Sequence, residues 1–187
     1  MKNFDYLEPR TVTEACALLK QHGGEAKVFA GGVHLTILMK QGLLEPKSLI
    51  NIKKIPELKG IRFDDGEGLT IGALVTHREL ETSALVKEKF PVLCEAEREV
   101  ANIRVRNMGT VGGNLASGEP LTDLSQIFIA LDGTAKIAGP SGQRTIPVEE
   151  LFLDFYTTCL AEDEILTQVV LPPLPPRSGI EYIRFSS

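Results

Sequence analysis

The sequence predicts an α+β fold with two lobes, a small α/β lobe followed by a larger lobe built on antiparallel sheet. Within residues 11–52, short apolar runs alternate with stretches of helical periodicity, which is the order of a parallel α/β unit. From residue 60 onward, pairs of short apolar runs flank turn residues, a pattern typical of β-hairpins. We therefore assign residues 1–57 to the small lobe and residues 58–187 to the larger one.

The small lobe is predicted to contain two helices and two strands. Apolar residues recur at helical spacing in residues 11–22, Thr11 or Thr13 can cap the start, and Gly23-Gly24 follows. The apolar run "KVFA" then leads into a second glycine pair, after which helical periodicity resumes at Leu35 and continues to Gly42. The run "SLINI", residues 48–52, indicates the next strand.

The larger lobe is predicted to mix hairpins with helices. A first hairpin turns at residues 64–66, and "THREL" begins a helix with Thr76 as its cap and Glu79 at the capping-box position. Helical periodicity follows in residues 91–101 and 121–131. A second hairpin spans residues 134–148, and "EILTQVVLP" indicates a late strand before a proline-rich patch.

Composition narrows the classes of partner. The formal net charge of −5 argues against nucleic-acid or anionic-membrane binding, because both need concentrated Lys and Arg. No apolar run approaches the length of a membrane span, and the N-terminus lacks the apolar core of a signal peptide, so we expect a cytoplasmic protein. The three cysteines form no CxxC pair, so we expect neither a disulfide framework nor a metal site.

The sequence shows no acid/base or nucleophilic apparatus, and we expect no catalytic side chain. Glu95, Glu97 and Glu99 are spaced two apart, and such side chains do not face one another on a helix. We interpret "REVANIRVR" as a solvated helix end whose charges these glutamates balance. His34 and His77 are interpreted as ordinary surface or capping residues, since neither has a neighbouring ligand for a metal.

Two glycine-rich stretches stand apart from this background. The first glycine site, "FAGGVHL" (Phe29 to Leu35), lies where a strand meets a helix, which suits either an anion on the helix start or a simple tight turn. The second glycine site, Gly109 to Gly118, is an uncharged stretch that we expect to be a loop buried against something. Its spacing matches neither a P-loop nor a Rossmann fingerprint. One such site in each lobe would grip the two phosphates of a pyrophosphate from opposite sides.

The stretches "FAGGVHLTILMK" and "IRVRNMGTVGGNLASGEPLTDL" resemble the two flavin-binding signatures of the FAD subunit of the molybdenum hydroxylases. This family includes the carbon monoxide dehydrogenase medium subunits and the xanthine dehydrogenase FAD domains. The likeness extends from "FDYLEPRTVTEACALL" to "EDEILTQVVLP" and "YIRFS". It implies a two-lobed fold of the vanillyl-alcohol-oxidase (PCMH) type, with FAD held between the lobes.

The resemblance also implies which residues bind the cofactor. Those assigned to the FAD pyrophosphate are Phe29, Ala30, Gly31, Gly32, Val33, His34, Leu35, Gly109, Thr110, Gly112, Gly113 and Asn114. Asp123 would hold the ribose or adenine end by hydrogen bonding. Ile165 or Leu166 would lie near the isoalloxazine, and Arg184 stands where the family often places a basic residue near the flavin.

By the same resemblance, the chain would be an electron-transfer subunit. Its partners would be a molybdopterin-binding large subunit and a [2Fe–2S] small subunit, and its FAD would pass electrons to an acceptor such as NAD or a quinone. We expect no [4Fe–4S] cluster, because the cysteine-bearing insertion of some relatives is absent. The family normally continues into a C-terminal domain that we do not find here, so that domain is either a different chain or missing from this sequence.

Two other functions stay open at this point. A cofactor-free assembly module with the same fold is one, since Val33-His34 departs from the family pattern and Glu119 would bring a carboxylate close to an anionic cofactor. The other is a flavoprotein similar to the UDP-N-acetylenolpyruvoylglucosamine reductases, whose catalytic Ser or Glu would have to lie in a further domain.

Overall fold

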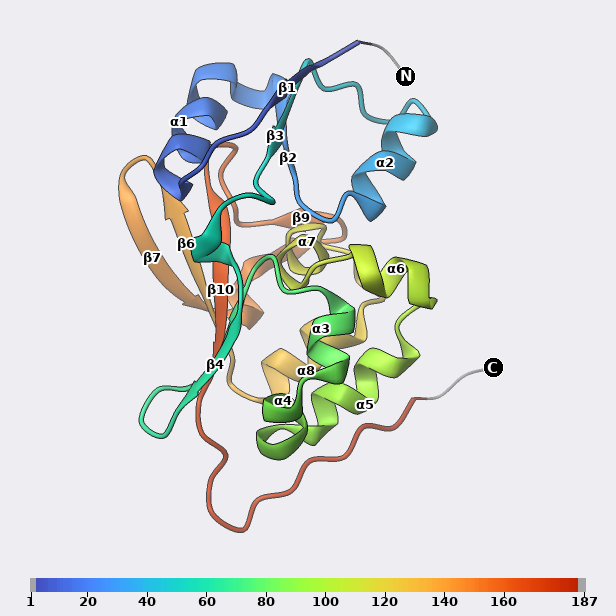
Figure 1. Ribbon diagram of the computed structural model, residues 1–187, viewed down its shortest axis with the longest axis vertical. Coiled ribbons are helices and arrows are strands. Elements are labelled where there is room, and N and C mark those ends of the chain that lie inside the picture. The colour runs from blue at the N-terminus through green and yellow to red at the C-terminus, as the bar shows by residue number, and fades with distance from the viewer. Residues whose placement is uncertain (1–2, 185–187) are drawn as a thin grey trace.

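The computed structural model describes residues 3–184, and Figure 1 shows its two parts. The first part is a three-stranded parallel sheet in the order β1-β3-β2, formed by β1 (Asp5–Leu7), β2 (Ala26–Phe29) and β3 (Ser48–Asn51). Helix α1 (Val12–His22) and the short η1 (Gly23–Glu25) connect β1 to β2, and α2 (Val33–Lys40) connects β2 to β3. The parallel small lobe predicted from the sequence is confirmed.

The second part is a five-stranded antiparallel sheet in the order β4-β5-β10-β6-β7. Its members are β4 (Ile61–Asp64), β5 (Gly68–Gly72), β6 (Thr134–Gly139), β7 (Gly142–Pro147) and β10 (Ile165–Leu171). The two hairpins β4-β5 and β6-β7 are those predicted from their turns. Strand β10 lies between them, where Val169 is opposite Ile71 on one side and Ala135 on the other.

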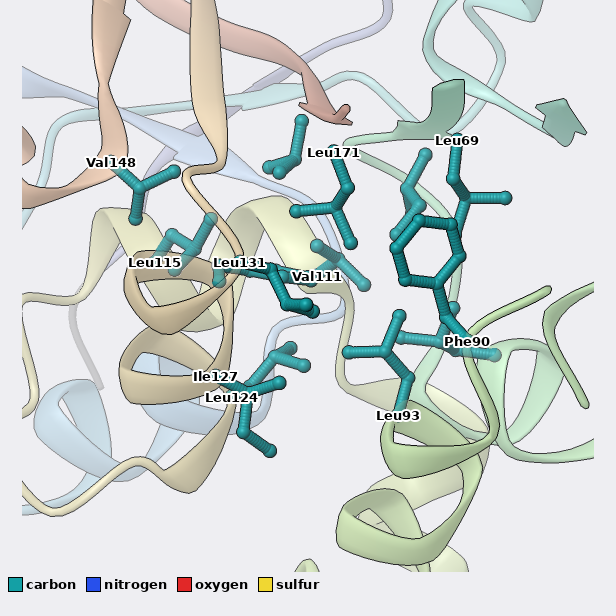
Figure 2. Close-up of a cluster of buried hydrophobic side chains, with 14 of the residues drawn as sticks. Leu69, Phe90, Leu93, Val111, Leu115, Leu124, Ile127, Leu131, Val148 and Leu171 are labelled. Carbon is teal, nitrogen blue, oxygen red and sulfur yellow. The ribbon is translucent and has the colours of Figure 1, made fainter. Parts of the chain in front are cut away.

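The chain between β5 and β6 forms a helical layer that packs on one face of this sheet (Figure 1). Its helices are α3 (His77–Thr82), α4 (Ala84–Lys89), α5 (Pro91–Glu99), α6 (Ile103–Met108), α7 (Val111–Ala116) and α8 (Asp123–Ala130). Figure 2 shows Leu69 and Leu171 of the sheet pointing toward Phe90, Leu93 and Val111 of this layer. Burial of these apolar side chains is the main force that holds the layer to the sheet.

The other face of the antiparallel sheet packs against the small lobe. Cys16 and Leu19 of α1 belong to one buried cluster with Ala138 of β6 and Ile165 of β10. Leu58 of η2 (Pro56–Leu58) joins the same cluster. The two lobes are therefore packed together through a shared apolar core.

Some elements differ from the sequence-based expectation. Strand β1 was not predicted, and the segment expected to be a loop, Gly109 to Gly118, forms α7 instead. The small elements η3 (Val148–Leu151), β8 (Phe152–Asp154) and β9 (Thr157–Thr158) also went unpredicted. Within residues 3–184, no helix is long and apolar enough to cross a lipid bilayer.

The sheets change between Asn51 and Ile61, and the lobe boundary at residues 57 and 58 stays a prediction. Residues 1–2 of the assigned small lobe and residues 185–187 of the assigned larger lobe lie outside the described part of the chain.

Candidate functional site

The two glycine sites lie in direct contact. Gly31, two residues after β2, packs on the backbone carbonyl of Met108 and on the Cα of Gly109. A Cβ at position 31 would overlap that carbonyl oxygen, so only glycine fits without a backbone shift. Figure 1 accordingly shows the start of α2 facing α6 and α7. Segments far apart in the sequence thus form one junction between the lobes.

The first glycine site places an uncapped helix start at this junction. Gly32 precedes α2 with a φ of +77°, a left-handed conformation that suits glycine, and no side chain caps the helix. The first intrahelical bond runs from the N–H of Thr36 to the carbonyl of Gly32 at 3.0 Å. The N–H groups of Val33, His34 and Leu35 precede that bond and have no acceptor within the helix. Together with the positive end of the helix dipole, they can bind an anion.

The second glycine site has a different character. Its backbone N–H groups donate within the protein, from Gly109 to Val105, Val111 to Val75, Gly112 to Ala73 and Asn114 to Thr110. The N–H of Gly113 donates to the Thr110 hydroxyl at 3.1 Å, which makes Thr110 the cap of α7. The expectation of a loop is wrong, because Val111–Ala116 is helical, and these backbone donors are already engaged.

Two side-chain groups of the second site are nevertheless arranged for a ligand. The hydroxyl of Thr110 accepts one hydrogen bond and keeps its own proton to donate. The Oδ1 atom of Asn114 is buried and has no hydrogen-bond partner among the described residues. A buried acceptor without a donor is costly unless a bound group supplies one. FAD fits this arrangement, because it carries hydroxyl donors for Asn114 and an anionic diphosphate for α2.

A pocket of about 220 Å³ lies at the junction. It is lined by Ala30, Gly31, Lys53, Lys59, Leu74, Thr76, Asn107, Met108 and Thr110. Its size suits a diphosphate group better than a whole dinucleotide. The sequence interpretation missed Lys53, Lys59 and Thr76. The position of Lys53 just after β3 was an available signal, since the carboxyl ends of the adjacent parallel strands β2 and β3 meet at the same edge.

A buried polar pair, His77 and Glu97, packs against the second glycine site at Gly109. His77 is 3% exposed, its backbone N–H donates to the carbonyl of Gly109 at 3.1 Å, and its ring lies against Gly109. The Nδ1 of His77 lies 2.8 Å from Oε2 of Glu97, which is fully buried. Burial raises the pKa of the Glu97 carboxyl, and the hydrogen bond from His77 opposes that rise. The interpretations of His77 as a surface residue and of Glu97 as solvated are wrong.

Two arginines of the basic stretch before the second glycine site, Arg104 and Arg106, differ in their contacts. The Arg106 guanidinium contacts Glu81 at 3.1 Å and donates to the carbonyls of Val100 and Arg98 at 3.0 and 3.2 Å. It therefore ties the end of α5 to α6, the helix that precedes the second glycine site. Arg104, in contrast, is exposed, as a solvated helix end predicts.

Three of the remaining predicted cofactor residues, His34, Asp123 and Arg184, lie in two separate contacts. The ring of His34 meets that of Tyr156 edge-on, with 6.1 Å between centroids, so it joins the two lobes. The Glu119 carboxylate beside Tyr156 raises the pKa of that phenol. Asp123 and Arg184 are brought together, 3.8 Å apart, and Arg184 also donates to the carbonyl of Glu99 at 3.0 Å.

Ile165 and Leu166 are not among the residues that line the pocket. Ile165 is 3% exposed and packs in the core shared with the small lobe, whereas Leu166 is 4% exposed and packs against the helical layer. Their side chains alternate across β10, as in any strand with two buried faces. Their predicted place beside an isoalloxazine ring stays a prediction, as do the other assigned cofactor contacts.

Comparison with known proteins decides the family. Residues 2–174 match the family described as the FAD binding domain in molybdopterin dehydrogenase. The chain belongs to this family. FAD is the family's cofactor, and both the predicted family resemblance and the predicted two-lobed FAD-binding α+β fold are confirmed.

Relatives and solved structures agree with this placement. The medium chain of carbon monoxide dehydrogenase from Hydrogenophaga pseudoflava is 40% identical over 179 residues, covering 96% of this chain and 62% of the relative. Subunit alpha of the 6-hydroxypseudooxynicotine dehydrogenase complex from Paenarthrobacter nicotinovorans is 34% identical over 184 residues, covering 98% and 62%. A solved structure of the Hydrogenophaga enzyme superposes with a TM-score of 0.90 at 39% identity, over 94% of this chain and 61% of that one. The chain thus spans about 62% of the length of these curated relatives.

Proposed function

We propose that this chain is the FAD-binding part of an electron-transfer subunit in a molybdenum-hydroxylase-type oxidoreductase. Bound FAD supplies the redox chemistry, and the chain binds and orients it. Electrons would arrive from a [2Fe–2S] small subunit, fed by a molybdopterin-binding large subunit, and would leave to an acceptor such as NAD or a quinone. The meeting of the two glycine sites at one pocket is the observation that carries this proposal.

The residues of the junction divide the work of holding the cofactor. The uncapped start of α2 would receive diphosphate oxygens, and the hydroxyl of Thr110 would donate to one of them. Asn114 would accept from a cofactor hydroxyl through the oxygen that lacks a partner. The Asp123–Arg184 pair would serve the far end of the cofactor, as the resemblance implies.

The names of the relatives support a division of labour between subunits. One is a chain of an enzyme named for carbon monoxide and another belongs to a complex named for 6-hydroxypseudooxynicotine, although both align with nearly all of this chain. A domain that is shared by enzymes with such different substrates is better suited to a step that they have in common, electron transfer, than to substrate recognition. We infer that a partner subunit selects the organic substrate.

The test is flavin retention by the purified chain. After incubation with FAD and gel filtration, the wild-type protein should keep the absorbance bands of bound flavin. Asn114→Leu should weaken FAD binding about tenfold, because hydrogen bonds between uncharged groups contribute about 1 kcal/mol and a buried donor would be left unpaired. Gln126→Leu is the matched control, because it also replaces a side-chain amide by leucine, at an exposed position on α8. It should leave FAD affinity unchanged.

A chain that stays colourless with FAD, both alone and with partner subunits supplied, would contradict the proposal. That outcome would favour the cofactor-free assembly module.

A further inference from the structure

Positive charge gathers at the junction of the two glycine sites. Lys53 and Lys59 both line the pocket there, together with Gly31 and Thr110. Within residues 3–184, neither lysine forms a salt bridge. The neighbouring Lys54 shows the contrast, since its ammonium lies 2.9 Å from a carboxylate oxygen of Glu8. Two lysines without a carboxylate partner thus line one pocket of an acidic chain.

The ammonium of Lys53 is held in place beside the start of α2. Its Nζ lies 4.4 Å from the centroid of the Phe29 ring, a cation–π contact. The same ring packs over Gly32, where a Cβ would come within 2.5 Å of ring atom Cε2. The backbone N–H of Lys53 donates to Oδ1 of Asn51 at 3.1 Å, which fixes the turn that follows β3. Lys53 thus approaches the first glycine site from a defined direction.

The glycine sites by themselves carry little charge for an anion. The second site has used most of its backbone N–H groups within the protein, and α7 is a six-residue helix whose cap is filled by Thr110. The start of α2 contributes the equivalent of about half an elementary charge. A diphosphate carries two negative charges, so most of the compensating charge must come from side chains.

We propose that Lys53 and Lys59 are the electrostatic clamp for the diphosphate of FAD. This inference rests on the proposed FAD-binding function. It names the residues that make the site selective for a flavin dinucleotide. The ammonium groups bind phosphate oxygens as point charges, while the glycines allow the close approach. Riboflavin, which shares the ring system and lacks the diphosphate, gains nothing from the lysines.

The experiment compares Lys53→Met, Lys59→Met and the double variant with wild type, using Lys54→Met as the matched control. Dissociation constants for FAD and for riboflavin are measured by flavin fluorescence at low and high salt, and circular dichroism checks the fold. Each pocket variant should bind FAD about tenfold more weakly, since a charged hydrogen bond is lost, and Lys54→Met should match wild type. The double variant should lose most of the salt dependence, and riboflavin binding should not change.

Each other result overturns a specific statement. If wild type binds FAD and the double variant has the same dissociation constant and salt dependence, the lysine clamp is wrong while the proposed function stands. If the affinity for riboflavin falls as much as that for FAD, the lysines do not act on the diphosphate, and the clamp is again wrong. If wild type itself binds no FAD, the proposed function fails first.

Discussion

At the residue scale, burial decides what the charged side chains of this chain do. Glu95, Glu97 and Glu99 share one helix, yet only Glu97 is fully buried, where His77 is its hydrogen-bond partner. A buried carboxyl is tolerated only when it is paired or protonated. Sequence spacing places these glutamates on α5 correctly, but the helix α3 that covers Glu97 is brought there by tertiary packing.

Removing one member of the buried pair should cost more than removing both. His77→Phe keeps a ring of similar size and leaves Glu97 buried without its partner, so we expect a loss of about 3–5 kcal/mol in the free energy of unfolding. Adding Glu97→Leu should recover at least half of that loss, because the unpaired carboxyl is gone. Urea unfolding of both variants measures the difference. Equal losses in the single and double variants would show that ring packing, and not the pair, is the main contribution.

At the element scale, α7 forms in spite of its composition. Two of its six residues are glycine, and each glycine costs a helix about 1 kcal/mol relative to alanine. Thr110 caps the helix, and the buried side chains of Val111 and Leu115 anchor it in the core. Gly112 also has to be small, since a Cβ there would come within 2.5 Å of the Cβ of Ala73. Packing therefore overrides a propensity that favoured a loop.

Loss of the α7 cap should be measurable in stability and in flavin binding. Thr110→Val keeps the shape of the side chain and removes the hydroxyl, so we expect a loss of about 1 kcal/mol, as for other helix caps. The affinity for FAD should also fall, because the hydroxyl lies at the pocket. Thr110→Ser, which keeps the hydroxyl, should retain most of both properties. Indistinguishable unfolding midpoints for the two variants would contradict the capping role.

At the scale of the whole molecule, the site exists only because the lobes pack closely. The core shared by α1, η2, β6 and β10 fixes the parallel sheet against the antiparallel one. That packing brings Gly31 onto Met108 and closes the pocket between the two glycine sites. Neither lobe has the complete set of pocket residues alone.

Gly31→Ala should disturb both the packing of the lobes and the site. The added methyl group overlaps the carbonyl oxygen of Met108, so we expect destabilisation of about 1–3 kcal/mol and weaker FAD binding. Gly179→Ala is the matched control, because no atom lies within 4 Å of a Cβ there. It should change the free energy of unfolding by less than about 0.5 kcal/mol. If Gly31→Ala behaved like this control, the lobes would have room that the structure does not show.

The sequence by itself determined the features that depend on local order. The parallel unit, the two hairpins, the capping box of Thr76 and Glu79 and the late strand all follow from periodicity, turn residues and caps, which act between near neighbours. The two glycine stretches were likewise visible as a long pattern and pointed to the family.

Tertiary structure alone decided how distant residues meet. It turned the second glycine stretch into a partly buried helix, brought Lys53 and Lys59 to line the pocket, and buried Glu97 against His77. These outcomes depend on which surfaces exclude water together, and that is a property of packed segments far apart in the chain.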